Sequence, residues 1–273
     1  EFHSEITRRN PMQDFNIHSH TIRCLHAVGT DEEYVLKAIE AGIKTLGFSD
    51  HVPLIDDKGM GDRMTMNQVQ EYIDSVLSLK EKYKNEIDIK LGFECEYFKT
   101  NLEHYRQLLK VCDYLILGHH YEEPNSIDYC EFCDDTRVLR YAESICAGMK
   151  SGLFTYLAHP DYFMIPRNDW SDSCTKAMEK IFICAKEEGI PIEINLKGMR
   201  YGKQQYSFGE SFIYPNKKTV ELLMKHRPMI VYGLDCHDPI HYLEMQDYIT
   251  LFHNEYPEFD LPSVKFDELK IKK

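Results

Sequence analysis

The stretch DFNIHSH, residues 14–20, shows the pattern that the rest of the chain repeats: a short run with apolar residues that ends in metal-ligand side chains. Asp14–His18 predicts a strand, because short apolar runs are typical of strands buried on both faces. Side chains at i and i+2 of an extended segment point to the same side, so His18 and His20 could hold one ion together. Six further strands are expected: Thr45–Ser49, Ile87–Phe93, Asp113–Gly118, Phe154–Ala158, Ile190–Leu196 and Pro228–Leu234.

Helical patterns separate these strands. Thr30 and Glu33 have the spacing of a capping box before the first helix, and Gly42 provides its stop. Further helices are expected over 66–84, 101–112, 135–150, 173–188, 216–227 and 239–254. This order of about seven β-then-α units predicts an α/β fold, a distorted TIM-like barrel of about seven parallel strands, (β/α)7. A doubly wound open sheet is the alternative that strand order leaves open.

The chain of 273 residues contains no Pro- or Gly-rich linker, so a single domain over residues 12–273 is expected. Residues 1–11 precede the first Met, and we interpret them as a vector-derived leader whose His3 has no part in the chemistry. The sequence has neither a long apolar run nor a signal-peptide layout, which favours a cytoplasmic protein without a membrane span. The oligomeric state is left open.

Charge and cysteine content restrict the classes of partner. The formal net charge of -13 argues against binding to nucleic acid or anionic membranes. A phosphate ester would also be repelled, unless bound divalent ions reverse the sign locally. The nine cysteines are odd in number and scattered, so reduced thiols are expected instead of a disulfide framework.

Polar residues follow every predicted strand, and six of the seven strands end in metal-ligand types. Because the carboxyl ends of parallel strands meet on one face of a barrel, these side chains should converge. Imidazole and carboxylate groups suit zinc, manganese and iron. The sequence therefore predicts a metal centre built from the following residues: His18, His20, Asp50, His51, Glu94 or Glu96, His119 or His120, His159, Asp235 and His237.

Taken together, these motifs resemble the PHP (polymerase and histidinol phosphatase) family, from Met12 to about Tyr242. The segments Phe48–Pro53 and Glu193–Asn195 resemble its histidinol-phosphate phosphatase branch. The resemblance implies a distorted barrel of seven strands that binds three divalent metal ions, as Zn, Mn or Fe.

The resemblance also implies how the ligands divide among the ions. Glu94 matches the bridging carboxylate better than Glu96 does, and His120 matches better than His119. One ion would take His18, His20 and Asp235, and Glu94 would bridge it to a second ion completed by His120 and His159. A third ion would take His26, His51 and His237.

The implied reaction is hydrolysis of L-histidinol phosphate to L-histidinol and inorganic phosphate, as in histidine biosynthesis, by a hydroxide that two ions share. Asp235, His237 and Arg200 are the expected catalytic residues. The donor of a proton to the leaving alkoxide stays open among His237, Asp50 and water. Substrate contacts are expected from Arg200 and Lys197 first, then from Arg167, Arg63, Glu122 and Tyr162.

Three other functions fit part of the pattern. One is a different phosphoesterase of the same family, acting on phosphotyrosine proteins, sugar phosphates or nucleotides. A second is an amidohydrolase-like enzyme that cleaves C–N bonds, although the fourth strand lacks the lysine such enzymes often use. The third is a non-catalytic metal-binding protein, which would fill its coordination sphere and leave no open position for water.

Overall fold

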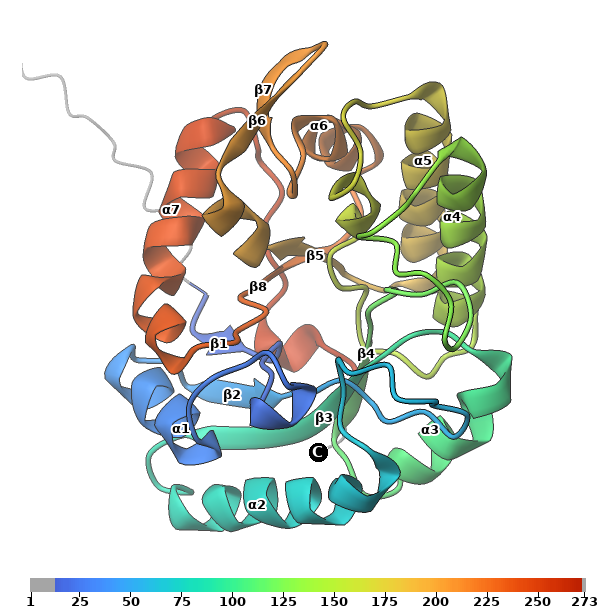
Figure 1. The fold of residues 1–273 in the computed structure, drawn as a ribbon. Helices are drawn as coiled ribbons and strands as arrows, with labels where there is room; N and C mark the ends of the chain where they lie inside the picture. Colours follow the sequence, from blue (N-terminus) through green and yellow to red (C-terminus); the bar gives the residue numbers. More distant parts are fainter. Residues whose placement is uncertain (1–12, 272–273) are drawn as a thin grey trace, which may run out of the picture.

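The computed structural model describes residues 13–271, and the expected leader over residues 1–11 lies outside this range. The chain has an α/β fold with parallel strands at its centre (Figure 1). One sheet contains four parallel strands in the order of the sequence: β1 (Phe15–Asn16), β2 (Thr45–Phe48), β3 (Asp88–Cys95) and β4 (Tyr114–Leu117). A second sheet pairs β5 (Ile192–Asn195) with β8 (Ile230–Gly233), also in parallel.

Isolated parallel bridges connect the two sheets. Leu157 pairs with Leu117 at the end of β4 and with Ile192 at the start of β5, and Ser19 pairs with Cys236 beyond β8. The expected strand Phe154–Ala158 forms no regular strand and has a single bridge residue, Leu157, although Thr155 N and Ala158 N also donate to backbone carbonyls of β4. His159 ends this extended segment, because its φ of 25° turns the backbone into the left-handed region.

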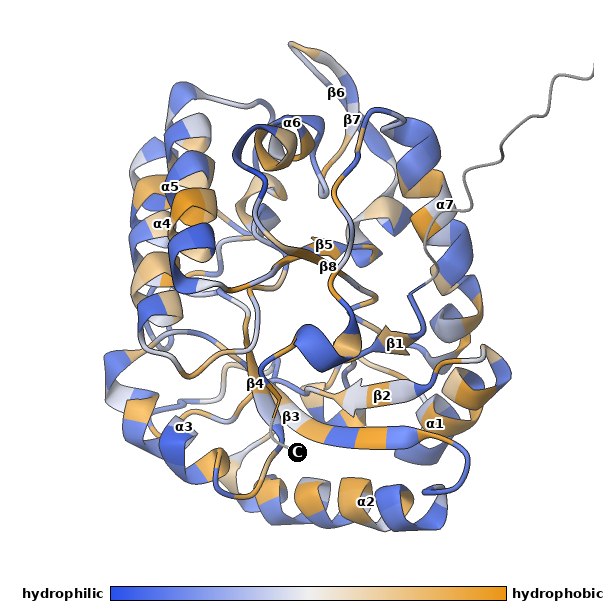
Figure 2. Cartoon of the chain, turned by 180° about the vertical axis from the view of Figure 1, so that it is seen from behind, coloured by the Kyte–Doolittle hydropathy of each residue, from blue (hydrophilic) through white to orange (hydrophobic). Residues whose placement is uncertain are grey.

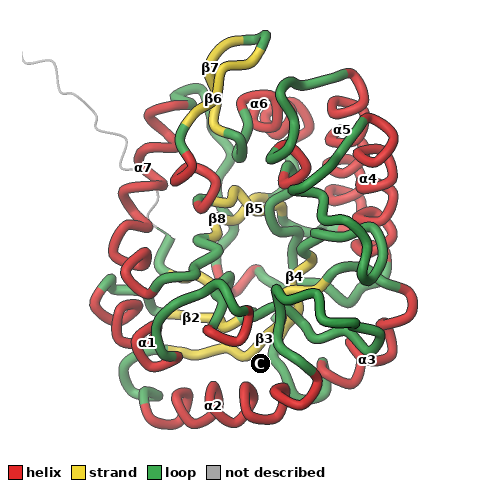
Figure 3. Tube along the Cα trace, in the orientation of Figure 1, coloured by secondary structure: helices red, strands yellow, loops and turns green. Residues whose placement is uncertain are grey.

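Helices surround these strands (Figures 1 and 3). The capping box before the first helix is confirmed, because Thr30 Oγ1 accepts from Glu33 N and the Glu33 carboxylate accepts from Thr30 N at 2.6 Å. The helices are α1 (Asp31–Glu40), α2 (Val69–Lys82), α3 (Leu102–Leu108), α4 (Asp135–Lys150), α5 (Asp172–Glu188), α6 (Lys217–His226) and α7 (Met245–Glu255). Each α-helix lies within or close to a segment that the sequence analysis assigned as helical.

An antiparallel hairpin between β5 and α6 was not expected from the sequence. It pairs β6 (Lys203–Tyr206) with β7 (Gly209–Phe212) and projects from the edge of the molecule in Figure 1. Its first strand is mostly exposed and polar, so it lacks the apolar alternation that identifies a half-buried strand. Gly209, with a φ of 109°, supplies the turn that brings the two strands together.

Apolar side chains form two layers. The larger layer lies between the strands and the helices, whose apolar residues alternate with polar ones along each helix in Figure 2. The smaller layer contains residues spaced two apart along the extended segments. The 3-10 turn Phe266–Glu268 packs its neighbouring residues against this layer. Its buried members are Phe15, Ile17, Tyr114, Ile116, Tyr156, Ala158, Val231, Val264 and Leu269. Within residues 13–271, no helix is both long and apolar enough to cross a membrane.

The closing role of the C-terminal segment predicts a stability effect. Leu269→Ala should lower the free energy of unfolding by about 2 kcal/mol or more, because it leaves a void against the inner layer. Chemical denaturation followed by circular dichroism measures this. Leu251→Ala is the control, since Leu251 is 41% exposed on α7 and its loss should change stability by less than about 0.5 kcal/mol. Equal losses of stability in the two variants would contradict the packing of Leu269 in the smaller apolar layer.

Candidate metal centre

Glu94, near the end of β3, lies at the centre of the predicted cluster. Its side chain is almost completely buried, and its nearest imidazole nitrogen, His159 Nε2, lies 2.7 Å from Oε1. Burial alone would raise the pKa of Glu94, but His120 and His18 outweigh this and hold the pKa well below its usual value. Five imidazoles have a nitrogen within 3.5 Å of this carboxylate: His18, His20, His51, His120 and His159.

Asp235 forms a second carboxylate centre beside the first. Its Oδ1 lies 3.1 Å from His20 Nε2, 3.6 Å from His18 Nε2 and 3.3 Å from His237 Nδ1. Lys197, after β5, places its ammonium 3.3 Å from the other carboxylate oxygen. His26 completes the group, because its Nε2 lies 2.9 Å from His237 Nε2. The structure thus brings all nine predicted metal ligands into one cluster.

Several buried polar atoms of this cluster lack a hydrogen-bond partner among the described residues. They include His18 Nε2, His20 Nε2, His51 Nδ1 and Glu94 Oε2. Leaving a buried polar group unpaired costs roughly 1–3 kcal/mol, so the isolated arrangement is unfavourable. Imidazole nitrogens and carboxylate oxygens are ligands that divalent cations accept, and sets such as His18, His20 and Asp235 lie within 4.8 Å of one another. The donor set therefore fits bound divalent metal ions.

Two further buried carboxylates orient the ligands from behind. Glu193, on β5, lies 2.7 Å from His18 Nδ1 and accepts from the backbone N–H of His159 at 3.0 Å. Glu96 lies 3.0 Å from His120 Nδ1. Contacts of this kind fix the ring orientation and leave the other nitrogen free for a metal. The sequence analysis did not assign this role to Glu193, although its i, i+2 spacing from Asn195 indicated a shared face.

Arg63, expected to contact the substrate, is buried against two carboxylates. Its buried guanidinium donates to both oxygens of Glu96 at 2.9 Å and also contacts Asp62. Burial raises the pKa of Glu96, but Arg63 outweighs it and lowers the pKa to about 2. With these donors occupied inside the protein, Arg63 supports the Glu96–His120 contact.

The two adjacent histidines after β4 point in different directions. His120 lies in the cluster, whereas His119 lies between the rings of Phe98, Tyr129 and Tyr141, with centroid distances of 5.6 to 6.3 Å. Burial lowers the pKa of His119 to about 3, so the ring is neutral. Of the two positions left open by the strand pattern, the structure places His120 beside Glu94.

The other expected substrate contacts separate into two groups. Tyr162 lies at the cluster, with its ring centroid 5.0 Å from His120 and 5.1 Å from His159. Arg167 is directed elsewhere, because its guanidinium donates to the Cys133 carbonyl, Asp135 and Ser171 near the start of α5.

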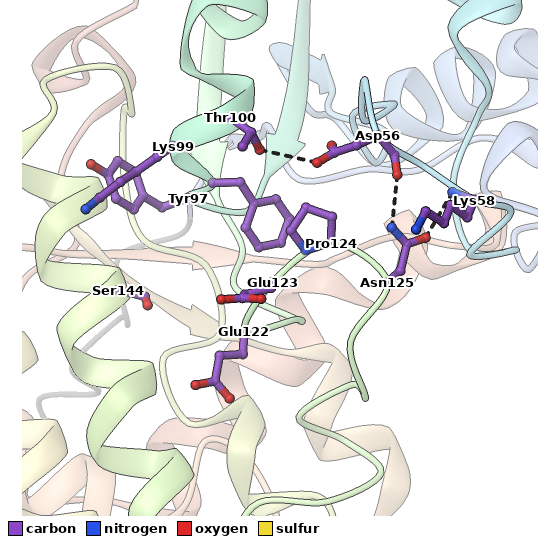
Figure 4. Close-up of a pocket in the computed structure, with 11 residues that line it drawn as sticks. Asp56, Lys58, Tyr97, Lys99, Thr100, Glu122, Glu123, Pro124, Asn125 and Ser144 are labelled. Atoms are coloured by element: carbon purple, nitrogen blue, oxygen red, sulfur yellow. Dashed lines mark hydrogen bonds between the residues drawn. The ribbon is translucent and has the colours of Figure 1, made fainter.

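Glu122 has its ion-pair partners on α4. Its carboxylate pairs with Arg140 and Arg137 of α4. It lines a separate surface pocket of about 570 Å³, drawn in Figure 4, in which Asn125 donates to the Asp56 carbonyl at 2.9 Å. None of the residues that line this pocket is a predicted metal ligand. Arg167 and Glu122 are thus engaged by local ion pairs, and their contact with substrate stays a prediction.

These features define a class of protein: an α/β fold whose parallel strands end in a buried cluster of histidines around shared carboxylates. The chain belongs to the PHP domain family, whose model matches residues 16–197.

The named relatives and a solved structure agree with this family. The chain is 26% identical over 238 residues to a "Probable histidinol-phosphatase" of Deinococcus radiodurans, covering 81% of this chain and 85% of the relative. A Schizosaccharomyces pombe protein of the same name is 26% identical over 249 residues, covering 81% and 80%. The fold is similar to that of histidinol phosphate phosphatase from Lactococcus lactis, which was solved with zinc, L-histidinol and phosphate. That match has a TM-score of 0.71, 16% identity, and 96% and 99% coverage.

The close approach of Glu94 to Gly118 predicts the effect of one added methyl group. A Cβ at Gly118 would lie 1.9 Å from Glu94 Oε1, so Gly118→Ala should displace the carboxylate and reduce bound metal after gel filtration. Elemental analysis measures the metal content. The control is Gly148→Ala on α4, where the Cβ would meet only side chains, the nearest being a Leu117 methyl at 2.9 Å. A Gly118→Ala protein that keeps its full metal content would contradict the central role of Glu94.

Proposed function

We propose that this protein is a histidinol-phosphatase that hydrolyses L-histidinol phosphate to L-histidinol and inorganic phosphate. The cluster around Glu94 and Asp235 carries the proposal, because it combines many divalent-metal ligands with neighbouring cations in a protein of net charge -13. The names of the relatives and the L-histidinol and phosphate in the Lactococcus lactis structure support this substrate.

We also infer the finer architecture of the barrel and of the centre. The parallel bridges through Leu157 and between Ser19 and Cys236 support a closed ring of seven extended segments. The nine clustered ligands support three ions, with zinc, manganese or iron as the suitable metals. One ion would be held by His18, His20 and Asp235, with Glu94 shared with a second ion at His120 and His159. His26, His51 and His237 would hold the third.

The protein residues hold and orient the reactants. Bound divalent ions neutralise phosphoryl oxygens and lower the pKa of water, which supplies a nucleophile near neutral pH. Burial raises the pKa of Asp235, but Lys197 and His18 outweigh this and hold it well below its usual value, so the carboxylate is ionised. Asp50 is unsuited to protonate the leaving alkoxide, because it is fully buried and its oxygens accept from Thr21 and from His51 N.

Arg200 is our first candidate to donate to a phosphate oxygen. It follows β5 in the 3-10 turn Lys197–Tyr201, and its buried Nη2 has no hydrogen-bond acceptor among residues 13–271. Its Nε lies 3.9 Å from the nearest carboxylate oxygen, on Glu244, which is beyond hydrogen-bond distance. Lys197 adds a second positive charge beside Asp235.

Removal of the Arg200 guanidinium should therefore weaken the enzyme. A charge-assisted hydrogen bond contributes about 1.5–3 kcal/mol, so Arg200→Ala should lower kcat/KM for histidinol phosphate roughly 10- to 100-fold. Steady-state kinetics measures this, with Arg106→Ala on the exposed face of α3 as the control. If Arg200→Ala and Arg106→Ala have the same kcat/KM, Arg200 has no role in phosphate binding.

The proposed activity is tested by phosphate release from L-histidinol phosphate beside a panel of sugar phosphates, nucleotides and phosphotyrosine peptides. The wild type should prefer histidinol phosphate by orders of magnitude in kcat/KM. His18→Ala and Glu94→Ala should be inactive, whereas His226→Ala on α6 keeps activity because that ring contacts Glu179 away from the cluster.

Two other results would each remove part of the proposal. In the first, the wild type hydrolyses the whole panel slowly and at similar rates while both cluster mutants are inactive. That result would support a metal-dependent phosphoesterase but contradict histidinol phosphate as its substrate. Equal activity in the wild type and the two cluster mutants would reject the site itself.

A further inference from the structure

A buried thiol lies beside the outermost part of the metal cluster. Cys24 ends the 3-10 turn Ile22–Cys24, and its side chain is inaccessible to solvent. Leu25 follows with a φ of 68°, a left-handed turn that brings His26 back toward the cluster. The Cys24 sulphur and one ring nitrogen each of His26 and His237 all lie within 4.8 Å of one another.

The orientation of the His26 ring directs the lone pair of its Nε2 toward His237. Its Nδ1 lies 2.8 Å from the Cys24 carbonyl oxygen, which can only accept, so Nδ1 carries the proton and Nε2 does not. This Nε2 lies 2.9 Å from His237 Nε2. Two nitrogens that bind one zinc ion at about 2.0–2.1 Å lie roughly 3 Å apart when they are adjacent ligands. The pair is therefore spaced like two ligands of a single ion.

His20 provides an independent observation on the other side of the thiol. It is completely buried, and neither ring nitrogen makes a hydrogen bond of good geometry within the described chain, although Asp235 and Asp50 oxygens lie 3.1 Å and 3.5 Å away. One ring nitrogen of His20, the Cys24 sulphur and an Asp50 oxygen lie within 4.8 Å of one another. The Cys24 sulphur thus belongs to two candidate metal groups, one with His26 and His237 and one with His20 and Asp50.

Cys236 shows that closeness to the ligands does not by itself direct a thiol at the ions. It is fully buried and lies between Asp235 and His237 in the sequence. Its thiol nevertheless donates to the Asp238 carbonyl at 3.1 Å. Among the nine free cysteines, Cys24 is the one whose sulphur belongs to the candidate metal groups given above.

We propose that the Cys24 sulphur is a ligand of the ion held by His26 and His237. This rests on the proposed metal centre and adds to it a sulphur ligand at one position. Binding replaces the thiol proton with the ion, and the proton leaves to solvent, so no oxidant or reductant is needed. A thiolate ligand makes this position prefer zinc or cobalt over manganese, because manganese favours oxygen ligands.

The test uses the full chain stripped of metal and reconstituted with cobalt(II), whose thiolate complexes show a charge-transfer band in the near ultraviolet. The wild type should show this band, and Cys24→Ser should lose it while keeping the visible bands of cobalt bound to nitrogen and oxygen. Cys184→Ala, which removes a buried thiol of α5, should match the wild type. Cys24→Ser should also weaken zinc binding at the site of His26 and His237 at least roughly tenfold in a chelator competition.

X-ray absorption of the zinc-loaded wild type gives a second readout that needs no variant. A sulphur neighbour at about 2.3 Å from zinc is expected, in addition to nitrogen and oxygen at shorter distances. A wild type without the cobalt band and without a zinc–sulphur distance would overturn the proposal, and so would a band that persists in Cys24→Ser. If the wild type still hydrolyses histidinol phosphate in that case, the sulphur ligand fails and the proposed function stands.

Discussion

The structure depends on one buried carboxylate surrounded by imidazoles. Glu94 is placed at the end of β3, and histidines from four other segments approach it within hydrogen-bond or ion-pair distance. A buried carboxylate is costly unless positive charge lies close to it. The imidazoles around Glu94 lie close enough to supply such charge, and the donor set fits divalent ions. The backbone around the cluster brings these ligands together.

The buried carboxylates require the backbone to pass very close to them. Gly118 and Gly233 lie against the carboxylates of Glu94 and Glu193, where an added Cβ would come within 1.9 Å and 1.7 Å of an oxygen. His159 and Asp235 adopt positive φ values of 25° and 46°, although neither is a glycine. Such conformations cost on the order of 1 kcal/mol or more and persist where the surrounding contacts compensate for them.

Buried carboxylates behind the cluster hold its histidines in orientation. Glu193 orients His18, and the buried pair of Arg63 with Glu96 orients His120. Removing one partner of such a pair leaves an uncompensated buried charge, which typically costs about 3–5 kcal/mol. A loop arginine has the same appearance in the sequence whether its partner is a phosphate or a neighbouring carboxylate, so the pairing of Arg63 with Glu96 could not be read from the sequence.

The sequence by itself determined the parallel α/β character, the helices and most of the clustered ligands, because apolar periodicity and the residues that follow each strand are local properties. His26 came only from the family resemblance; the strand pattern left open the choices between Glu94 and Glu96 and between His119 and His120, and it did not show which partners Arg63, Arg167 and Glu122 contact. Only the tertiary structure decided these points, since they depend on which side of a strand end faces the interior and on which carboxylate lies nearby. The β6–β7 hairpin and the position of Cys24 beside His26 and His237 required the folded chain for the same reason.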